Sequence, residues 1–391
     1  MAGLLIKNAR IITSTQTLES GWLLCEDGKI VSIDSGDTPS EFNGEIIDAG
    51  GKTLLPGFID LHVHGAKNHE AMDATPEALA TMGRFYAQHG VTGYLATTWT
   101  DNRERITAAL RNIANCVDTQ ADGATLLGAH LEGPYLNAEK GGAQNNTYIR
   151  RADKDEAQTF LDLNIIKLLA IAPEFPENHW LIEACAKRGI TVSAAHTSAT
   201  YEDIRHAVDL GLSQSTHTFN AQTSLHHREP GTVGAVLTMP QIRCELIADN
   251  VHVHPAVMNL LYRAKGAEGV ILISDAVRSA GMPDGDYPID DRTITVKEGV
   301  ARLPDGTLAG STLTMDRALY NFQHATGETL DQLWRSTSLN AAQAIGIADK
   351  TGSLEIGKTA DLVLIDENII PHVTIANGRI IYRKDTENVS S

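Results

Sequence analysis

Cysteine is scarce in this chain of 391 residues, which contains only four. They lie far apart, at Cys25, Cys116, Cys185 and Cys244, and no C-x-x-C pair occurs. This spacing excludes a disulfide framework and a cysteine-based zinc knuckle. We expect reduced, mostly buried cysteines instead.

Long apolar runs are also missing. The longest, residues 165–172 and 270–273, have the length of a strand, whereas a membrane-spanning helix needs roughly 18 apolar residues. Lys7 and Arg10 interrupt the first apolar stretch, which therefore does not resemble a signal peptide. These features predict a cytoplasmic protein without a membrane partner.

Positive charge is in deficit, because 32 Lys and Arg face 49 Asp and Glu, for a formal net charge of −17. This balance argues against nucleic acids and anionic membranes as partners. An anionic substrate would need a locally basic site. Most of the acidic excess is expected to serve solubility.

The length suits a barrel of roughly 250–300 residues with a satellite domain. Residues 1–55 and 355–391 are rich in short β-like segments separated by Gly and Asp turns. We therefore predict an α/β protein with two parts. Residues 56–354 form a (β/α)8 TIM-type barrel, and both chain termini together form a small β-sandwich domain.

Eight strand-length apolar runs alternate with helix-like segments in the central region. The runs are GFIDLHVHG, GVTGYLATT, TLLGAHLEGP, IKLLAIAPE, GITVSAAHT, QSTHTFNA, CELIADNVHV and GVILISDAV. Among the helix-like segments are residues 77–89, 106–118, 177–188 and 201–210. A serial βα repeat of this length favours a closed parallel barrel. Residues 281–305, rich in Gly, Pro and Asp, are predicted to be an excursion after the last strand.

Several of these strands end in a side chain that binds metals or moves protons, and active sites of such barrels lie at that end. The residues are His62, His64, Glu132, His196, His217 and Asp275. In a strand, residues i and i+2 point to the same face, so the His62 and His64 imidazoles can reach one ion.

Glu132 would be costly to bury unpaired at the end of an apolar strand. Either a metal ion or a salt bridge with Lys or Arg would compensate. With His196 and His217 it forms a ligand set that leaves room for water, as in catalytic metal sites. Asp275 is the candidate general acid and base, and a further ligand or a helix N-cap is the alternative.

Four more histidines, His226, His227, His252 and His254, follow barrel strands and are candidate substrate contacts. Arg228 is the best candidate for clamping an anion, because arginine pairs bidentately with phosphate. An ion pair with Glu229 is its alternative.

The motifs PGFIDLHVHG, LEGPYLN, AHTSAT, HTFNA, HHREPG, ISDAV and LAGSTLTM occur in this order over nearly the whole chain. Together they resemble the N-acetylglucosamine-6-phosphate deacetylases, and the similar N-acetylgalactosamine-6-phosphate deacetylases, of the amidohydrolase superfamily. The resemblance implies that Glu132, His196 and His217 are the principal metal ligands and that Asp275 is catalytic. It also implies that His62 and His64 serve a second ion in some members. One or two divalent ions are therefore expected, zinc first, with iron, manganese or cobalt as alternatives.

The resemblance further implies a phosphorylated N-acetylamino sugar as substrate and a homodimer in which Arg228 reaches the neighbouring active site. The expected substrate-binding residues are Ala143, Gln144, Asn220, Ala221, His227, Arg228, His252, Leu308, Ala309 and Gly310. The sequence departs from the family pattern at Gln144, where many members have histidine, at Asn145-Asn146 in place of a proline, and at Asn250 in place of a glycine. Two other classes stay open: an amidohydrolase for cyclic amides or N-acyl amino acids, and a non-catalytic barrel.

Overall fold

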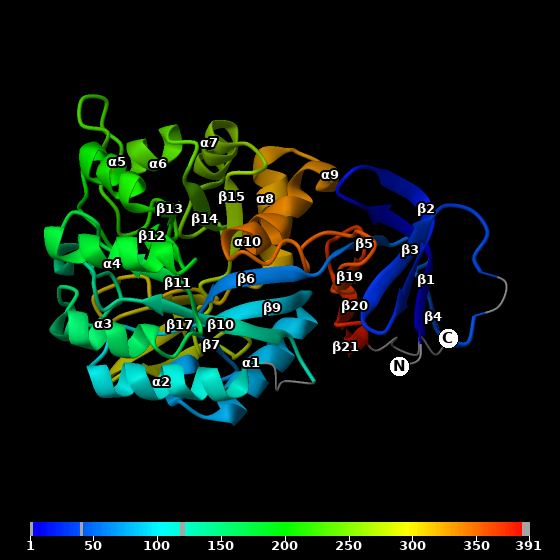
Figure 1. The fold of residues 1–391 in the computed structure, drawn as a ribbon, viewed down its shortest axis with the longest axis horizontal. Helices are drawn as coiled ribbons and strands as arrows, with labels where there is room; N and C mark the ends of the chain where they lie inside the picture. The colour runs from blue at the N-terminus through cyan, green and yellow to red at the C-terminus, as the bar shows by residue number, and fades with distance from the viewer. Residues whose placement is uncertain (1–2, 40–41, 118–121, 385–391) are drawn as a thin grey trace.

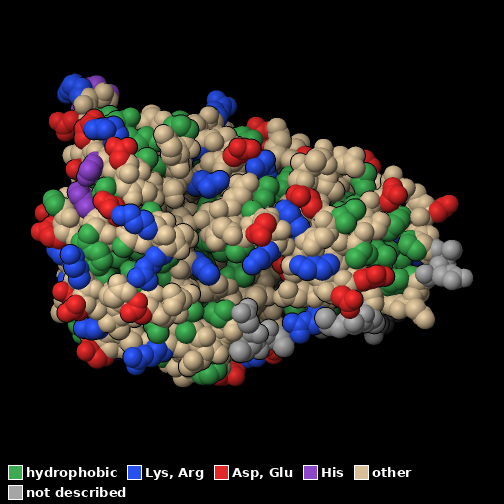
Figure 2. Space-filling view, in the orientation of Figure 1, with side chains coloured by type: hydrophobic (Ala, Val, Ile, Leu, Met, Phe, Trp, Pro, Cys, Tyr) green, Lys and Arg blue, Asp and Glu red, His purple; other side chains and the backbone are tan. Residues whose placement is uncertain are grey.

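The computed structural model describes residues 3–39, 42–117 and 122–384. Two bodies lie side by side: a barrel of strands and helices, and a sheet that carries both ends of the chain (Figure 1). Among the described residues, no helix is long and apolar enough to span a membrane. Acidic and basic side chains are interspersed on the face seen in Figure 2.

Eight parallel strands, adjacent in sequence order, form the barrel wall. They are β6 (Phe58–Val63), β9 (Val91–Thr97), β10 (Thr125–Glu132), β11 (Ile166–Ile171), β12 (Thr191–Ala194), β13 (Leu212–Ser215), β14 (Arg243–Ile247) and β15 (Val270–Ile273). The last strand returns to the first where Asp275 N–H donates to His62 O (2.9 Å) and His64 N–H donates to Ala276 O (2.8 Å). The predicted barrel and its eight strands are confirmed.

The helices follow the strands around the outside of the barrel (Figure 1). They are α1 (Pro76–Gln88), α2 (Arg103–Cys116), α3 (Lys154–Leu161), α4 (Pro176–Lys187), α5 (Tyr201–Leu210), α6 (Gly231–Thr238), α7 (Pro255–Lys265), α8 (Met315–Thr326), α9 (Leu330–Leu333) and α10 (Leu339–Ala344). Helix α2 begins three residues before its predicted start, because the Asn102 side chain accepts a hydrogen bond from Arg105 N–H (2.9 Å) and caps it. Its predicted last residue, Asp118, lies outside the described residues.

The terminal sheet joins both chain ends in the order β21-β20-β19-β5-β1-β2-β3, with β4 paired to β1. Its strands are β1 (Gly3–Ile12), β2 (Thr17–Glu26), β3 (Lys29–Asp34), β4 (Gly44–Asp48), β5 (Thr53–Pro56), β19 (Leu362–Ile365), β20 (Pro371–Ala376) and β21 (Arg379–Arg383). The sheet folds back on itself, since Ile30 N–H donates to Lys358 O and Ala360 N–H donates to Gly28 O (2.9 Å each). It encloses an apolar core of its own, as expected of a sandwich. Strands β4 and β5 run parallel to β1, so the sheet is mixed.

The predicted excursion after β15 is a three-stranded antiparallel sheet of β16 (Gly285–Ile289), β17 (Arg292–Lys297) and β18 (Val300–Arg302). It packs on the loop after β10, where Arg292 Nη2 donates to Ala143 O (2.7 Å). The excursion thereby forms one wall above the barrel mouth. A short hairpin after β6, made of β7 (Gly65–Ala66) and β8 (His69–Glu70), borders the same end.

Candidate metal centre and substrate cavity

All six predicted strand-end residues meet at the carboxyl end of the barrel, and none of these residues is more than 7% exposed. Three of them leave their strands with left-handed backbone: His196 (φ 41°), His217 (φ 29°) and Asp275 (φ 51°). Such a conformation costs a non-glycine residue roughly 1–3 kcal/mol. Strain concentrated at these three positions is typical of a functional site.

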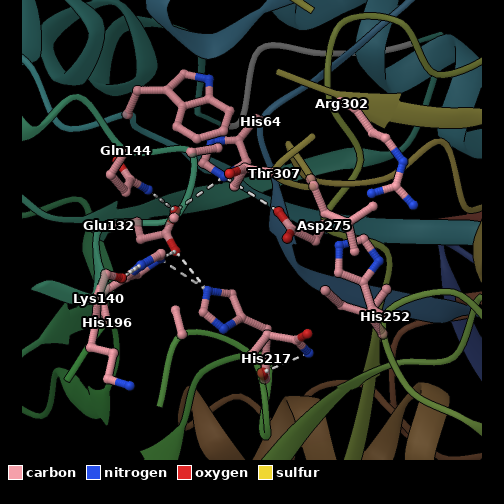
Figure 3. A pocket seen from close by; sticks show the side chains of 18 of the residues that line it. His64, Glu132, Lys140, Gln144, His196, His217, His252, Asp275, Arg302 and Thr307 are labelled. Carbon is pink, nitrogen blue, oxygen red and sulfur yellow. Dashed lines mark hydrogen bonds and ion pairs between the residues drawn. The ribbon is translucent and has the colours of Figure 1, made fainter. Parts of the chain in front are cut away.

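Glu132 lies at the centre of the cluster, and its two carboxylate oxygens face different histidine pairs (Figure 3). Its Oε1 is 3.2 Å from both His196 Nε2 and His217 Nε2, and these two nitrogens are 3.1 Å apart. Its Oε2 is 3.1 Å from His64 Nε2 and 3.4 Å from His62 Nε2. The sequence allowed a salt bridge between Glu132 and a Lys or Arg as the alternative to a metal ion. Among the described residues Glu132 pairs with histidines and with no Lys or Arg.

These distances fit a divalent cation. Ligand atoms bound tetrahedrally at about 2.0–2.1 Å from one ion stand about 3.3 Å apart. The Glu132, His196 and His217 atoms approach this spacing, and their ring nitrogens and carboxylate oxygen are the ligand types that Zn²⁺ and similar ions prefer. His62, His64 and Glu132 form a second group of the same kind.

Two ligands are oriented by hydrogen bonds on their far side. His196 Nδ1 lies 2.8 Å from Lys140 O, which requires a proton on Nδ1 and turns the Nε2 lone pair toward Glu132. His62 Nδ1 lies 3.2 Å from Glu245 Oε2 in the barrel interior. Glu245 also accepts a hydrogen bond from Gln214 Nε2 (2.6 Å). Both histidines therefore present Nε2 to the centre.

The two carboxylates of the cluster have lowered pKa values. Burial by itself raises the pKa of Glu132, but the charge of His62 and the close approach of the His196 and His217 rings outweigh it and hold that pKa well below its usual range. Burial likewise opposes the lowered pKa of Asp275, which the charge of His62 and a hydrogen bond from His64 produce. Asp275 Oδ1 lies 3.5 Å from Nε2 of each of these two histidines. No helix begins beside Asp275, which rules out the helix N-cap alternative.

A cavity of about 400 Å³ opens above this cluster. Seven of the ten predicted substrate-binding residues line it: Ala143, Gln144, Asn220, Ala221, His252, Leu308 and Gly310. Ala309 is fully buried behind its neighbours. His227 and Arg228 lie outside the cavity, on the exposed loop of residues 224–229 between β13 and α6.

That loop projects from the barrel at the upper left of Figure 1, and basic, acidic and histidine side chains gather on the projection in Figure 2. Arg228 Nη1 contacts His227 Nε2 at 2.6 Å. The alternative ion pair between Arg228 and Glu229 does not occur among the described residues.

Several residues of the site went unpredicted. Trp99, Glu139, Lys140, Ile247, Arg302 and Thr307 line the cavity. His252, which was predicted, holds Asp249 Oδ2 through Nδ1 (2.6 Å), and its ring lies between Asp275 and Arg302 in Figure 3. A carboxylate followed directly by the apolar residues Leu246 and Ile247 of strand β14 was the available signal for Glu245, whereas no sequence pattern marks Trp99 or Arg302.

A model of the amidohydrolase family matches residues 53–389. The N-acetylglucosamine-6-phosphate deacetylase of Lysinibacillus sphaericus is 38% identical, over 98% of this chain and 99% of its own. That of Bacillus subtilis is 35% identical, over 97% of both. The N-acetylgalactosamine-6-phosphate deacetylase of Escherichia coli O157:H7 is 34% identical, over 93% of this chain and 95% of its own.

Solved structures show the same likeness. The N-acetylglucosamine-6-phosphate deacetylase of Thermotoga maritima superimposes with a TM-score of 0.87 at 34% identity, covering 97% of this chain and 100% of the other. A mutant of the Mycobacterium smegmatis enzyme, in complex with N-acetyl-D-glucosamine-6-phosphate, superimposes with a TM-score of 0.91 at 29% identity, covering 97% and 100%.

Proposed function

This chain belongs to the amidohydrolase family, and from that premise we propose that it hydrolyses the acetamide of N-acetyl-D-glucosamine 6-phosphate to glucosamine 6-phosphate and acetate. The observation that carries the proposal is Glu132, set between two histidine pairs and beside Asp275 at the floor of the cavity. The nearly full-length similarity to deacetylases of this substrate supports it.

Glu132, His196 and His217 would hold one divalent ion, and His62 and His64 with Glu132 would hold a second. Zinc is the first candidate, with iron, manganese and cobalt as alternatives. When bound at such a site, a divalent ion lowers the pKa of water and polarises a carbonyl group.

Asp275 supplies the proton transfers. As water adds to the acetamide carbonyl, Asp275 accepts one of its protons, and it delivers that proton to the nitrogen when the C–N bond breaks. The second proton of the water leaves the acetic acid for the amine, so the products are acetate and the protonated amine. His252 lies on the same wall, where its ring is fixed by Asp249; with a proton on both ring nitrogens, its Nε2 would donate a hydrogen bond to the carbonyl oxygen as negative charge develops.

The cavity walls would position the rest of the substrate. Leu308 and Gly310 would bound the acyl group, with Ala309 buried behind them. Ala143 and Gln144 would lie on the sugar side, and Asn220 and Ala221 would face the phosphate. Lys140 and Arg302 add two cations of this chain to the cavity wall. Arg228 of the partner subunit, with His227 beside it, completes the phosphate site, which makes the working unit a homodimer in the cytoplasm.

The N-acetylgalactosamine 6-phosphate epimer is the second candidate, because a deacetylase of that name is 34% identical to this chain. The test is acetate release from both phosphorylated sugars and from unphosphorylated N-acetylglucosamine, after chelation and metal add-back. We expect metal-dependent release that is fastest with N-acetylglucosamine 6-phosphate. Faster turnover of the galactose epimer would reverse the assignment, and equal rates without the phosphate would overturn the phosphate site.

A further inference from the structure

The side chain of Gln144 is only 3% exposed and bridges two parts of the site. Thr100 N–H donates to Gln144 Oε1 (2.9 Å), and Gln144 Nε2 donates to Glu132 Oε2 (2.8 Å). A backbone N–H can only donate, so the amide atom facing Thr100 must be the carbonyl oxygen. The amide NH₂ group therefore points at the carboxylate.

The carboxylate of Glu132 needs such a partner. The last torsion of a glutamate side chain has a broad energy profile, so packing alone fixes the carboxylate plane poorly. His196 and His62 carry their protons on the far side, against Lys140 O and Glu245, and present lone pairs to Glu132 when neutral. These two rings hold the carboxylate only through an ion or an extra proton. His64 and His217 donate to it from Nε2 only in one tautomer, which an ion bound at Nε2 excludes.

Among the described residues, Gln144 therefore donates to Glu132 whatever the protonation state of the surrounding histidines, because an amide NH₂ group always carries its hydrogens. Its anchor is firm. Thr98 N–H donates to His130 O (3.0 Å), which ties the loop after β9 to β10, and Trp99 of the same loop stacks on His64 with ring centroids 3.8 Å apart. One loop thus orients His64 directly and Glu132 through Gln144.

We propose that Gln144 is a positioning residue for the metal centre: it fixes the plane of the Glu132 carboxylate, so that Oε1 faces His196 and His217 while Oε2 faces the other histidine pair. Gln144 contacts the ligand through one hydrogen of its amide, and its second Nε2 hydrogen is used by neither of these two contacts. The inference rests on the metal-dependent chemistry proposed above.

The test is the metal affinity of Gln144→Met, which keeps the length of the side chain and removes its amide. Zn²⁺ affinity is measured without substrate, by competition with a chromophoric chelator, and we expect a loss of about 10- to 100-fold. The visible absorption of the Co²⁺-loaded variant reports ligand geometry and should change as well. Thermal melting of the metal-free proteins checks that both are folded.

Gln343→Met is the matched control, because Gln343 bonds Arg243 on the surface, outside the cavity, and its loss should leave the affinity unchanged. A folded Gln144→Met protein with wild-type Zn²⁺ affinity and Co²⁺ spectrum would overturn the role of Gln144 alone. Wild-type protein that binds no ion would overturn the metal chemistry itself. Because the titration contains no substrate, neither outcome depends on which amide is hydrolysed.

Discussion

The floor of the cavity and the loop of residues 224–229 are assigned to one reaction but are built in opposite ways. The floor consists of His62, His64, Glu132, His196, His217 and Asp275, all buried and contributed by several strands. The loop is exposed throughout, and among the described residues the Arg228 guanidinium contacts the ring of its neighbour His227 (2.6 Å). A chemical step needs atoms held at fixed positions. An exposed loop can act in such a step only when it binds to another surface.

The comparison is tested most strongly at Asp275. Replacing it with asparagine keeps the shape of the side chain and removes the proton acceptor, so kcat should fall by about 10²- to 10⁴-fold. Steady-state acetate release gives the rate. Metal content, measured on the same sample, should stay near the wild-type value if Asp275 moves protons and is not needed as a ligand.

Asp366→Asn serves as the control, since Asp366 lies at the end of β19 in the terminal sheet and pairs with His372 (3.0 Å). Near-normal turnover by Asp275→Asn would contradict the assignment of Asp275 as the general acid and base. Loss of the ion together with activity would instead support the alternative that Asp275 is a further ligand.

The next largest effect is expected at the loop. Arg228→Ala removes a charge-assisted hydrogen bond to phosphate, worth about 1.5–3 kcal/mol, which corresponds to a rise in KM of roughly 10- to 100-fold. The rise should appear with the phosphorylated sugar and not with N-acetylglucosamine. An unchanged KM would separate the loop from the active site.

Mixing the Asp275→Asn and Arg228→Ala variants shows whether Arg228 acts on the neighbouring subunit. Asp275→Asn keeps Arg228, and Arg228→Ala keeps Asp275, so a mixed dimer contains one site with both groups. After denaturation and refolding of an equal mixture, about one quarter of all sites should regain wild-type KM. If activity merely equals the sum of the two parent proteins, Arg228 serves its own chain or no site.

The same contrast explains what the sequence could predict. His62 and His64 are two residues apart on a strand, and Glu132 ends an apolar run, so local patterns suffice to find them. Gln144 and Glu245 act through partners on other strands or loops, and those contacts depend on the register of the barrel. The left-handed backbone at His196, His217 and Asp275 likewise leaves no local mark in the sequence, because none of the three is a glycine, the residue that adopts it most readily.

Arg302 provides the finest test, because it combines features of both regions. It lines the cavity, yet it is exposed, and one of its nitrogens is held by Gly306 O (2.8 Å). An exposed cation that meets a phosphate contributes about 0.2–1 kcal/mol, so Arg302→Gln should raise KM by no more than about fivefold. The increase should shrink at high ionic strength, because salt screens exposed charges.

The control for Arg302 is Arg317→Gln, an arginine of α8 outside the cavity that stacks on Tyr320. If Arg302 contributes only an exposed charge, Arg302→Lys should keep the low KM that Arg302→Gln loses. A rise in KM as large as that of Arg228→Ala, insensitive to salt, would mean that this chain's own wall carries the phosphate site. Arg228 would then no longer be needed in the active site of a partner subunit. The floor would belong to the catalytic site, and the loop of residues 224–229 would be a surface unrelated to it.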